Sequence, residues 1–273
     1  MSKQQVQSIF GASADAYVTS KVHAKGASLN RVVELLQPQR HWQVLDVATG
    51  AGHMAFSLAP HVQKVVATDI TVEMLQRTAV GAQERGLTNL TVETADAENL
   101  PFSTGSFDVV TCRIAAHHFP DVDRFMAEAA RVLKPGGQLV VVDNVTPGSR
   151  LRGKKADLQR KAGQYVNTFE KLRDPSHGRC LSLDEWADQF RQAGLVLVHQ
   201  ETQQKEMDFA SWTDRLHVSA ATRLRLQALL LQAPTAVAEF LTPIQTGDRI
   251  VFYLTEAILI GRLGTEESRS GGA

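Results

Sequence analysis

A glycine-rich turn preceded by an acidic residue is the clearest chemical feature of this sequence. Residues 44–52 read VLDVATGAG, an apolar run that leads to Asp46 and then to Gly50 and Gly52. Where a strand enters a helix through such a turn, backbone amides at the carboxyl edge of a sheet bind nucleotide-like ligands. The glycines lack a Cβ and would let the backbone approach a ligand closely, although turn geometry alone also favours glycine. The pattern predicts a ligand site at this turn.

Two more acidic residues end the apolar runs that follow. Asp69 lies at the end of the second expected strand, in KVVATDI, and Asp96 lies at the end of the third, in VETADAENLPF. A carboxylate at the end of the second strand can accept hydrogen bonds from both ribose hydroxyls, or it can simply favour the start of the next helix. Asp96, or the amide of Ala97, is expected to meet an adenine edge. The three acidic residues are predicted to face one crevice.

Two ligands fit this pattern. Residues 50–55 read GAGHMA and match the dinucleotide pattern GxGxxA, with Asp69 near the expected distance. Asp46, however, lies before the glycines, where its charge would repel a pyrophosphate and attract an ammonium group; its alternative role is to cap the turn. The charges favour a ligand with a cationic amino acid end and a nucleoside end, and S-adenosylmethionine has this form.

Alternating strand and helix patterns must position these residues. Apolar runs that do not alternate with polar residues predict strands buried on both faces, and apolar residues three and four apart predict helices. Thr71 is a candidate N-cap, and Gly86 is a candidate helix stop. Strands are expected at residues 43–48, 64–70, 90–94, 107–114 and 138–143, and helices at 53–60, 71–85 and 121–133. This order predicts an α/β fold with a Rossmann-like, doubly wound parallel sheet.

The pattern changes after residue 145. Ser182 and Glu185 form a capping-box pair that opens a helix closed by Gly194. A strand at 195–199, helices over 208–241 with a break at Pro234, and a strand at 250–260 are expected next. A helix over 149–172 is expected to bury the stripe Leu151, Leu158, Ala162, Tyr165, Phe169 and Leu172. We therefore expect a helical lid at 1–38, a cofactor-binding core at 39–145, the rest of the sheet with a helical cover at 146–262, and a disordered tail at 263–273.

The composition excludes several classes of protein. With 29 basic and 29 acidic residues the formal net charge is zero, which removes the sustained positive field that nucleic acids and anionic membranes require. No stretch predicts a membrane span, and the N-terminus lacks a signal-peptide pattern. Cys112 and Cys180 form neither a disulfide framework nor a metal-ligand spacing. We expect a cytoplasmic protein without a nucleic acid partner.

Several motifs resemble, in order and spacing, those of class I S-adenosylmethionine-dependent methyltransferases. They are VLDVATGAG, the Asp69 strand end, DAENLPF with FDVV, HHFPD and RVLKPGGQLVVVD. The most similar branch is the small-molecule branch with the ubiquinone and menaquinone C-methyltransferases. The resemblance is strongest over residues 40–145 and implies a seven-stranded sheet with the last strand antiparallel under a helical cover. It implies cofactor contacts for Asp46, Ala48, Gly50, Gly52, Asp69, Ile70, Met74, Asp96, Ala97 and Arg113.

Two histidines are the candidate catalytic residues. Methyl transfer from a sulfonium depends mainly on positioning, and a base helps when the acceptor is a phenol, an enol carbon or an amine. His117 and His118 follow the fourth strand, where histidine suits this role by its pKa, and His117 is preferred. The alternative is that either ring only hydrogen-bonds backbone.

Other residues are expected on the acceptor side. The resemblance implies that an N-terminal lid brings Tyr17 and His23 to the pocket, and that a connecting segment brings His177 there. Asp143 and Asn144 follow the fifth strand and are expected to contact substrate or loop backbone. A metal would need more oxygen ligands than these, so no metal site is predicted.

The resemblance implies a methyltransferase that acts on a small, aromatic or apolar molecule and releases S-adenosylhomocysteine. Carbon, oxygen and nitrogen acceptors share this cofactor domain, so the acceptor atom stays open. An NAD(P)-dependent oxidoreductase that uses GAGHMA and a non-catalytic cofactor-binding subunit are the alternatives. The sequence also leaves a homodimer open.

Overall fold

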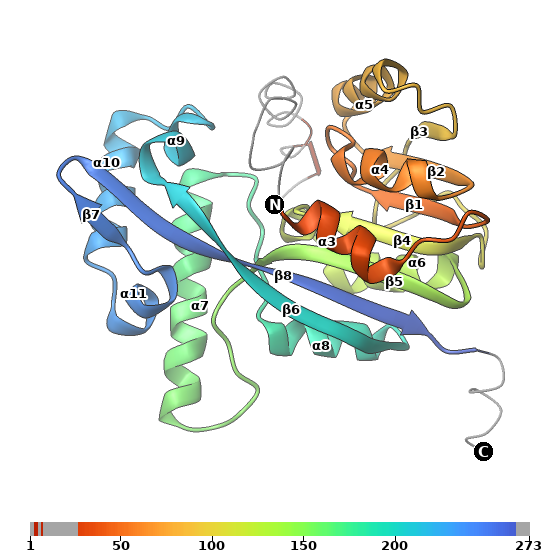
Figure 1. The fold of residues 1–273 in the computed structure, drawn as a ribbon. Coiled ribbons are helices and arrows are strands. Elements are labelled where there is room, and N and C mark those ends of the chain that lie inside the picture. The colour runs from red at the N-terminus through yellow and green to blue at the C-terminus, as the bar shows by residue number, and fades with distance from the viewer. Residues whose placement is uncertain (1–2, 5–6, 8–26, 266–273) are drawn as a thin grey trace.

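A mixed sheet forms the centre of the molecule (Figure 1). The computed structural model describes residues 3, 4, 7 and 27–265, so the expected sites at Tyr17 and His23 and most of the expected lid lie outside the described residues. The strand order is β3-β2-β1-β4-β5-β8-β6, with β7 paired to β8. The strands are β1 Gln43–Val47, β2 Lys64–Asp69, β3 Leu90–Thr94, β4 Phe107–Arg113, β5 Leu133–Val145, β6 Leu195–Asp208, β7 Ile244–Thr246 and β8 Arg249–Leu263.

Parallel pairing brings the carboxyl ends of neighbouring strands to one edge of the sheet. β1 pairs in parallel with β2 and β4, β2 pairs with β3, and β4 pairs with β5. β8 runs antiparallel between β5 and β6. The doubly wound order of seven strands and the antiparallel last strand are confirmed. The short β7, which forms a hairpin with β8, is an eighth strand that the sequence did not predict.

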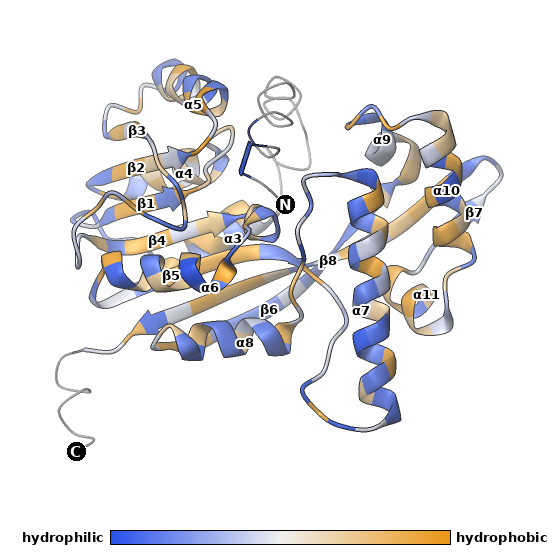
Figure 2. Ribbon diagram, turned by 180° about the vertical axis from the view of Figure 1, so that it is seen from behind, coloured by the Kyte–Doolittle hydropathy of each residue, from blue (hydrophilic) through white to orange (hydrophobic). Residues whose placement is uncertain are grey.

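Helices cover both faces of the sheet, as strands without polar alternation require. Leu29 of α3 and Leu58 of α4 pack on one face, and Phe125 of α6 and Trp186 of α8 pack on the other. Figure 2 shows hydrophobic residues along the central strands. The helices are α3 Ala27–Leu36, α4 His53–Leu58, α5 Val72–Glu84, α6 Val122–Val132, α7 Lys154–Arg173, α8 Leu183–Gln192, α9 Phe209–Asp214, α10 Ala220–Leu231 and α11 Thr235–Leu241.

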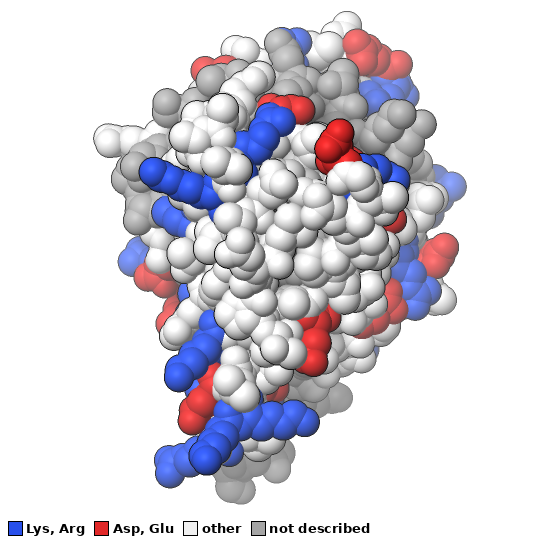
Figure 3. Space-filling view, turned by 90° about the vertical axis from the view of Figure 1, so that its left-hand side faces the viewer, with Lys and Arg blue, Asp and Glu red and all other residues white. Residues whose placement is uncertain are grey.

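β6 and β8 continue past β5 into a second lobe, formed with α7, α9, α10, α11 and β7 (Figure 1). We call this part the cover lobe. It has its own apolar cluster, in which the rings of Phe169 and Trp212 stack at 5.1 Å between centroids and Phe252 meets Trp212 edge-on. Figure 3 shows the molecule from the side of the cover lobe, where Lys, Arg, Asp and Glu lie mainly around the edge of the visible face. The cover lobe is therefore anchored by long strands that belong to the central sheet.

The expected buried stripe of the helix after residue 149 was wrong for its first two residues, whereas Ala162 and Phe169 are buried as expected. α7 begins at Lys154, after Gly153 with φ of 106°. Leu151 and Leu158 are 74% and 56% exposed, whereas the α7 residues Ala156, Ala162, Gly163, Val166, Phe169 and Glu170 are buried. The inward face is set by close packing at Gly163, where an added Cβ would lie 2.1 Å from the Pro147 carbonyl oxygen.

Other boundaries follow the sequence more closely. The Ser182–Glu185 capping box at α8 is confirmed, and α10 and α11 are separated at Pro234. Thr71 occupies the N-cap position of α5, but its side chain makes no cap hydrogen bond. β6 reaches Asp208 instead of residue 199, and Leu263, expected in the tail, is a buried end residue of β8. None of the helices that the structure describes is long and apolar enough to cross a membrane.

Candidate functional site

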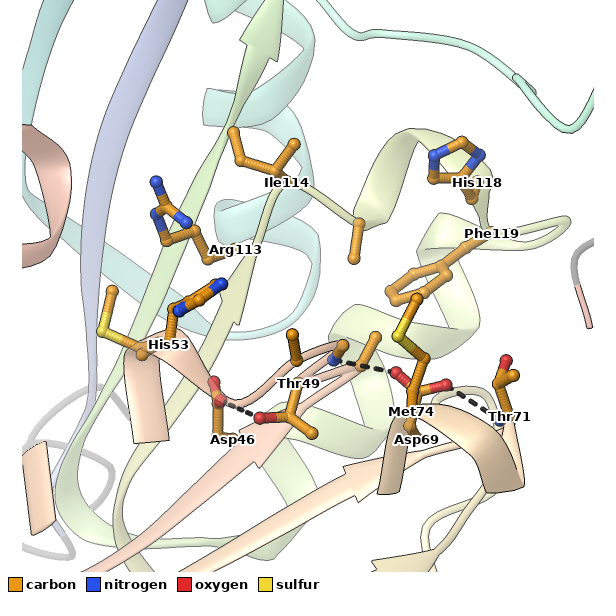
Figure 4. Close-up of a pocket in the computed structure, with 15 residues that line it drawn as sticks. Asp46, Thr49, His53, Asp69, Thr71, Met74, Arg113, Ile114, His118 and Phe119 are labelled. Atoms are coloured by element: carbon orange, nitrogen blue, oxygen red, sulfur yellow. Dashed lines mark hydrogen bonds between the residues drawn. The ribbon is translucent and has the colours of Figure 1, made fainter. Parts of the chain in front are cut away.

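A cavity lies where β1, β2 and β4 end, and we call it the crevice cavity (Figure 4). The space outside the protein atoms in this cavity is about 760 Å³, part of it open to solvent. In Figure 4, Arg113, Ile114 and Phe119 lie across the cavity from Asp46 and Asp69. The lining residues are Asp46, Ala48, Thr49, Gly50, Ala51, His53, Met54, Asp69, Thr71, Met74, Arg113, Ile114, Ala115, His118 and Phe119.

Asp46 is a buried carboxylate at the floor of the crevice cavity. Only 1% of the residue is exposed, and its two oxygens accept hydrogen bonds of 2.6 Å from the hydroxyls of Thr49 and Thr111. Burial raises the pKa of Asp46 to about 6, although both hydroxyls act in the opposite direction. A carboxylate held in this way attracts a cationic ligand group strongly, because little water screens its charge.

Asp69 organises the glycine turn as well as lining the cavity. Its Oδ2 accepts a hydrogen bond of 3.0 Å from Gly50 N, and its Oδ1 accepts one of 2.8 Å from Thr71 N. Burial raises the pKa of Asp69 despite these backbone donors. Each carboxylate oxygen can still accept a further hydrogen bond from a ligand. Asp69 therefore connects the turn before α4 with the N-terminus of α5, on either side of the cavity.

The two glycines of the turn differ. A Cβ on Gly50 would meet no heavy atom of residues 3, 4, 7 or 27–265 within 4 Å, whereas a Cβ on Gly52 would lie 2.6 Å from Phe56 Cζ and 2.8 Å from Thr78 Cγ2. Both residues have positive φ, 56° and 83°. Gly52 does not line the crevice cavity. The prediction that Gly52 lets the backbone approach a ligand lacks support from this geometry, because the side chains beside it belong to the protein.

Asp96 lies in an adjoining hollow, which we call the edge cavity, and not in the crevice cavity. Its Oδ2 is 2.6 Å from Lys3 Nζ, and its Oδ1 accepts a hydrogen bond from Glu98 N. The expectation that all three acidic residues face one crevice stays a prediction for Asp96, whose cavity shares a wall with the crevice cavity. The lining residues are Lys3, Ala48, Ile70, Ala95, Asp96, Ala97, Glu98, His118, Phe119 and Pro120, of which Ala48, His118 and Phe119 also line the crevice cavity.

Ile114 is a strained residue at the end of β4. Its φ is 52°, a conformation that β-branched residues rarely adopt and that costs about 1–3 kcal/mol. Its amide donates to the Val142 carbonyl at 2.7 Å, which holds the chain in this turn. The preceding Arg113 donates through Nε to Ser28 Oγ at 3.1 Å. The turn directs the chain from β4 to the two histidines.

His117 forms a buried pair with Asp143. Its Nδ1 donates to Asp143 Oδ1 at 2.6 Å, and its backbone amide donates to Asp143 Oδ2 at 2.9 Å. Burial alone would lower the pKa of His117, but the charge and hydrogen bond of Asp143 outweigh burial, and the pKa lies above its ordinary value. His117 lines a second cavity and not the crevice cavity. The pair holds the ring with Nε2 opposite the carboxylate.

His118 and His177 are neutral neighbours of this pair. The His117 ring centroid lies 4.1 Å from that of His118 and 5.5 Å from that of His177. Burial lowers the pKa of His118 to about 4 and that of His177 to about 2, and the positive charge of His117 adds to both shifts. His118 Nδ1 donates to the Ser176 carbonyl, and His177 Nε2 donates to Asn167 Oδ1.

The second cavity, which we call the polar cavity, adjoins the first. It shares Ile114 and His118 with the crevice cavity and encloses about 580 Å³ outside the protein atoms. Its other walls come from α7, α9, β6 and the end of β5. The lining residues are Ile114, His117, His118, Asn144, Glu170, Arg173, Asp174, His177, Lys205, Met207, Trp212, Arg215 and Leu254.

Most predicted site residues gather in these three cavities. Asp46, Ala48, Gly50, Asp69, Met74, Arg113 and His118 line the crevice cavity, Ile70, Asp96 and Ala97 line the edge cavity, and His117, Asn144 and His177 line the polar cavity. The sequence analysis missed Thr49, Thr111 and Ile114, and it missed the polar cavity residues of α7, β6 and α9. Only Thr49, three residues after Asp46, could have been found from the local sequence.

Comparisons with known proteins agree with this geometry. A family model described as a methyltransferase domain matches residues 45–141. The chain is 36% identical over 208 residues to the uncharacterized methyltransferase YcgJ of Bacillus subtilis, covering 76% of this chain and 78% of that protein. It is 43% identical over 121 residues to the ubiquinone/menaquinone biosynthesis C-methyltransferase UbiE of Bartonella tribocorum, covering 42% and 46%. The crystal structure of YcgJ from Bacillus subtilis matches with a TM-score of 0.79 at 33% identity, covering 88% of this chain and 98% of that chain.

Proposed function

The chain belongs to the class I S-adenosylmethionine-dependent methyltransferases, and we propose that it methylates a small molecule bound in the polar cavity, with His117 as the general base. Membership in this family makes S-adenosylmethionine the cofactor and favours it over the NAD(P) that GAGHMA also allowed. The observation that carries the proposal is the shared wall of Ile114 and His118, which sets the His117–Asp143 pair beside the crevice cavity.

The residues of the crevice cavity fit the cofactor. The buried Asp46 carboxylate matches an ammonium group, and the space around Gly50 leaves room for the amino acid end. Asp69 has the acceptor oxygens that a ribose requires, and Met74 supplies an apolar wall. The edge cavity beyond Ala48 would hold the adenine end. When bound, S-adenosylmethionine supplies a methyl group that is already activated by its sulfonium.

His117 is the residue of this chain that we propose to take a proton from the acceptor. As the acceptor atom takes the methyl group, its proton passes to Nε2 of His117, and Asp143 stabilises the imidazolium that forms. The hydrogen bond from Nδ1 to Asp143 leaves Nε2 as the nitrogen that can accept a proton. His118, with a pKa of about 4, is a weaker base and separates the two cavities.

The test compares His117→Ala with wild type on a panel of quinol, phenol and amine acceptors, measured as S-adenosylhomocysteine released. We expect turnover to fall by about a hundredfold while the affinity for S-adenosylmethionine, measured by calorimetry, stays unchanged. His199→Gln on β6 is the matched control, because His199 lines none of the three cavities. A variant that loses cofactor affinity but keeps its turnover at saturation would exclude His117 as the base.

Finer expectations about partners stay predictions. We propose a free small molecule and not a nucleic acid as the acceptor, supported by the neutral composition, and a cytoplasmic location. A homodimer is supported only by exposed apolar residues at the end of the cover lobe, among them Leu224 and Ile244. Light scattering of the purified chain, with Leu224→Glu beside wild type, would decide whether two copies associate there.

A further inference from the structure

Three buried polar atoms of residues that line the polar cavity have no hydrogen-bond partner among the residues that the structure describes. They are Asn144 Oδ1, Glu170 Oε1 and the indole Nε1 of Trp212. Glu170 is 7% exposed and Trp212 is 1% exposed, so bulk water does not satisfy these atoms. A buried polar atom without a partner costs about 1–3 kcal/mol, and such a cluster on one cavity indicates a ligand that supplies the partners.

The unpartnered atoms specify what that ligand must carry. The indole nitrogen can only donate, so it requires an acceptor on the ligand, whereas the oxygens of Glu170 and Asn144 require donors. Three basic side chains, Arg173, Lys205 and Arg215, line the same cavity. The ligand must therefore offer hydrogen-bond donors to Asn144 and Glu170 and an acceptor to the indole of Trp212, in a cavity that also contains three basic side chains.

Four charged residues of the polar cavity already interact with other residues of the chain. Asp174 Oδ1 accepts hydrogen bonds from the backbone amide and the hydroxyl of Ser176. Glu170 Oε2 lies 3.9 Å from Arg173 Nη1, and burial raises the pKa of Glu170. Lys205 is paired with the buried Glu256. Arg173 stacks on Trp212 at 4.5 Å from the ring centroid, so its guanidinium and the indole N–H belong to one surface.

Asn144 and Trp212, two of the residues with unpartnered atoms, come from different elements around the cavity. Asn144 directly follows Asp143, the partner of His117, at the end that shares Ile114 and His118 with the crevice cavity. Trp212 comes from α9 and Arg215 from the turn after it, within the cover lobe. A ligand that spans the cavity therefore meets the base at one end and the basic residues at the other.

We propose that the methyl acceptor is a polar small molecule with an oxyanion at one end and a hydroxyl or amino group, which takes the methyl, at the other. The oxyanion binds Arg215, Arg173 and the indole N–H of Trp212, and the methyl-accepting group lies near Asn144 and His117. This inference rests on the proposed function and narrows the aromatic or apolar acceptor expected from the sequence. An aromatic body remains compatible when it carries both polar groups.

The test follows the indole N–H resonance of Trp212 in the full chain saturated with S-adenosylhomocysteine. Trp42 and Trp186 contribute the other two indole signals, and Trp212→Phe assigns the third. The probes are 3-hydroxybenzoate for a carboxylate and phenyl phosphate for a phosphate monoester. Their neutral counterparts are 3-hydroxybenzyl alcohol, which matches the first probe in size, and 1-naphthol.

We expect at least one oxyanion probe to move the Trp212 signal in a saturable manner and to bind about tenfold tighter than either neutral probe. Whichever of 3-hydroxybenzoate and phenyl phosphate binds more tightly identifies the oxyanion as a carboxylate or a phosphate. Arg215→Gln should weaken that binding about tenfold, because a charged partner of the oxyanion is lost. Arg223→Gln on α10 is the matched control, since Arg223 pairs with Asp214 and lines none of the three cavities.

Three results would overturn the inference. They are a neutral probe that binds as tightly as its charged counterpart, a Trp212 signal that no oxyanion probe moves at millimolar concentration, and an Arg215→Gln variant with unchanged affinity. Calorimetric binding of S-adenosylhomocysteine is measured on the same samples. If the cofactor product binds while the probes fail, only the acceptor class is wrong, whereas a chain that binds no S-adenosylhomocysteine contradicts the proposed function itself.

Discussion

The affinity for S-adenosylhomocysteine should depend on pH through Asp46. Because the pKa of Asp46 is about 6, the carboxylate is ionised above this pH and takes up a proton below it. Only the ionised form attracts the ammonium group of the ligand. At about pH 5 roughly a tenth of the protein has an ionised Asp46, so the dissociation constant should be about tenfold weaker than at about pH 7.5.

Thr111 provides a sharper test of the same reasoning. Its hydroxyl donates to Asp46 Oδ1, but Thr111 itself does not line the crevice cavity. A hydrogen bond to a charged group contributes about 1.5–3 kcal/mol, so Thr111→Val should raise the pKa of Asp46 by about one to two units. The pH at which affinity falls should move upward by the same amount, while the affinity at high pH stays close to wild type.

Calorimetric titration over this pH range is the assay, with His53→Gln as a control because His53 is another titratable residue of the crevice cavity.

Acid unfolding through Asp46 does not explain a loss of affinity, because the pKa of Asp46 is higher in the folded than in the unfolded chain. The folded state then binds the proton more readily, so this group adds stability as the pH falls from about 6 towards its ordinary value. Affinity that is flat with pH, or a midpoint that Thr111→Val leaves unchanged, would refute the assignment of Asp46.

Three stability predictions follow from close contacts, each measured as the free energy of unfolding in denaturant. Gly163→Ala should destabilise the chain by about 1–3 kcal/mol, because the new Cβ meets the Pro147 carbonyl oxygen at 2.1 Å; an unchanged value would show that α7 can shift. Gly52→Ala should destabilise it by a similar amount through its positive φ and its contact with Phe56, without a direct loss of cofactor contacts. Ser182→Ala should cost about 1 kcal/mol through loss of the α8 capping box, and a neutral result would mean that Glu185 alone caps the helix.

The crevice cavity could be predicted from the sequence because each of its parts is local. Asp46 and Asp69 each end an apolar run, and parallel pairing necessarily brings such strand ends to one edge of the sheet. The role of Thr111 could not be predicted, since it depends on the register that sets Thr111 beside Asp46 across two strands. The role of Lys3 at Asp96 was equally hidden, because 93 residues separate the two.

The polar cavity was missed for a different reason. Lys205 lies in the segment HQETQQKE of β6, which has no apolar alternation and therefore carries no strand signal, although pairing with β8 extends β6 to Asp208. Glu170 and Arg173 line the cavity from the end of α7, and the apolar spacing along α7 gave no indication that these two charged residues would do so. Side chains brought together by a long edge strand and the end of a helix leave no local pattern that a sequence can show.

The end of β4 links the two sites. Ile114, which has a strained backbone conformation, lines both cavities. A few residues later in the chain, His117 lines the polar cavity and His118 lines both cavities. Ile114 also packs against the apolar cluster on one face of the sheet, so a ligand that displaces its side chain must alter that packing as well. Strain at such a position persists only when the surrounding structure holds it. Val142 and Asp143, which accept hydrogen bonds from Ile114 and His117, are neighbouring residues of β5. The end of β5 therefore fixes the position of the proposed base relative to the wall of the crevice cavity.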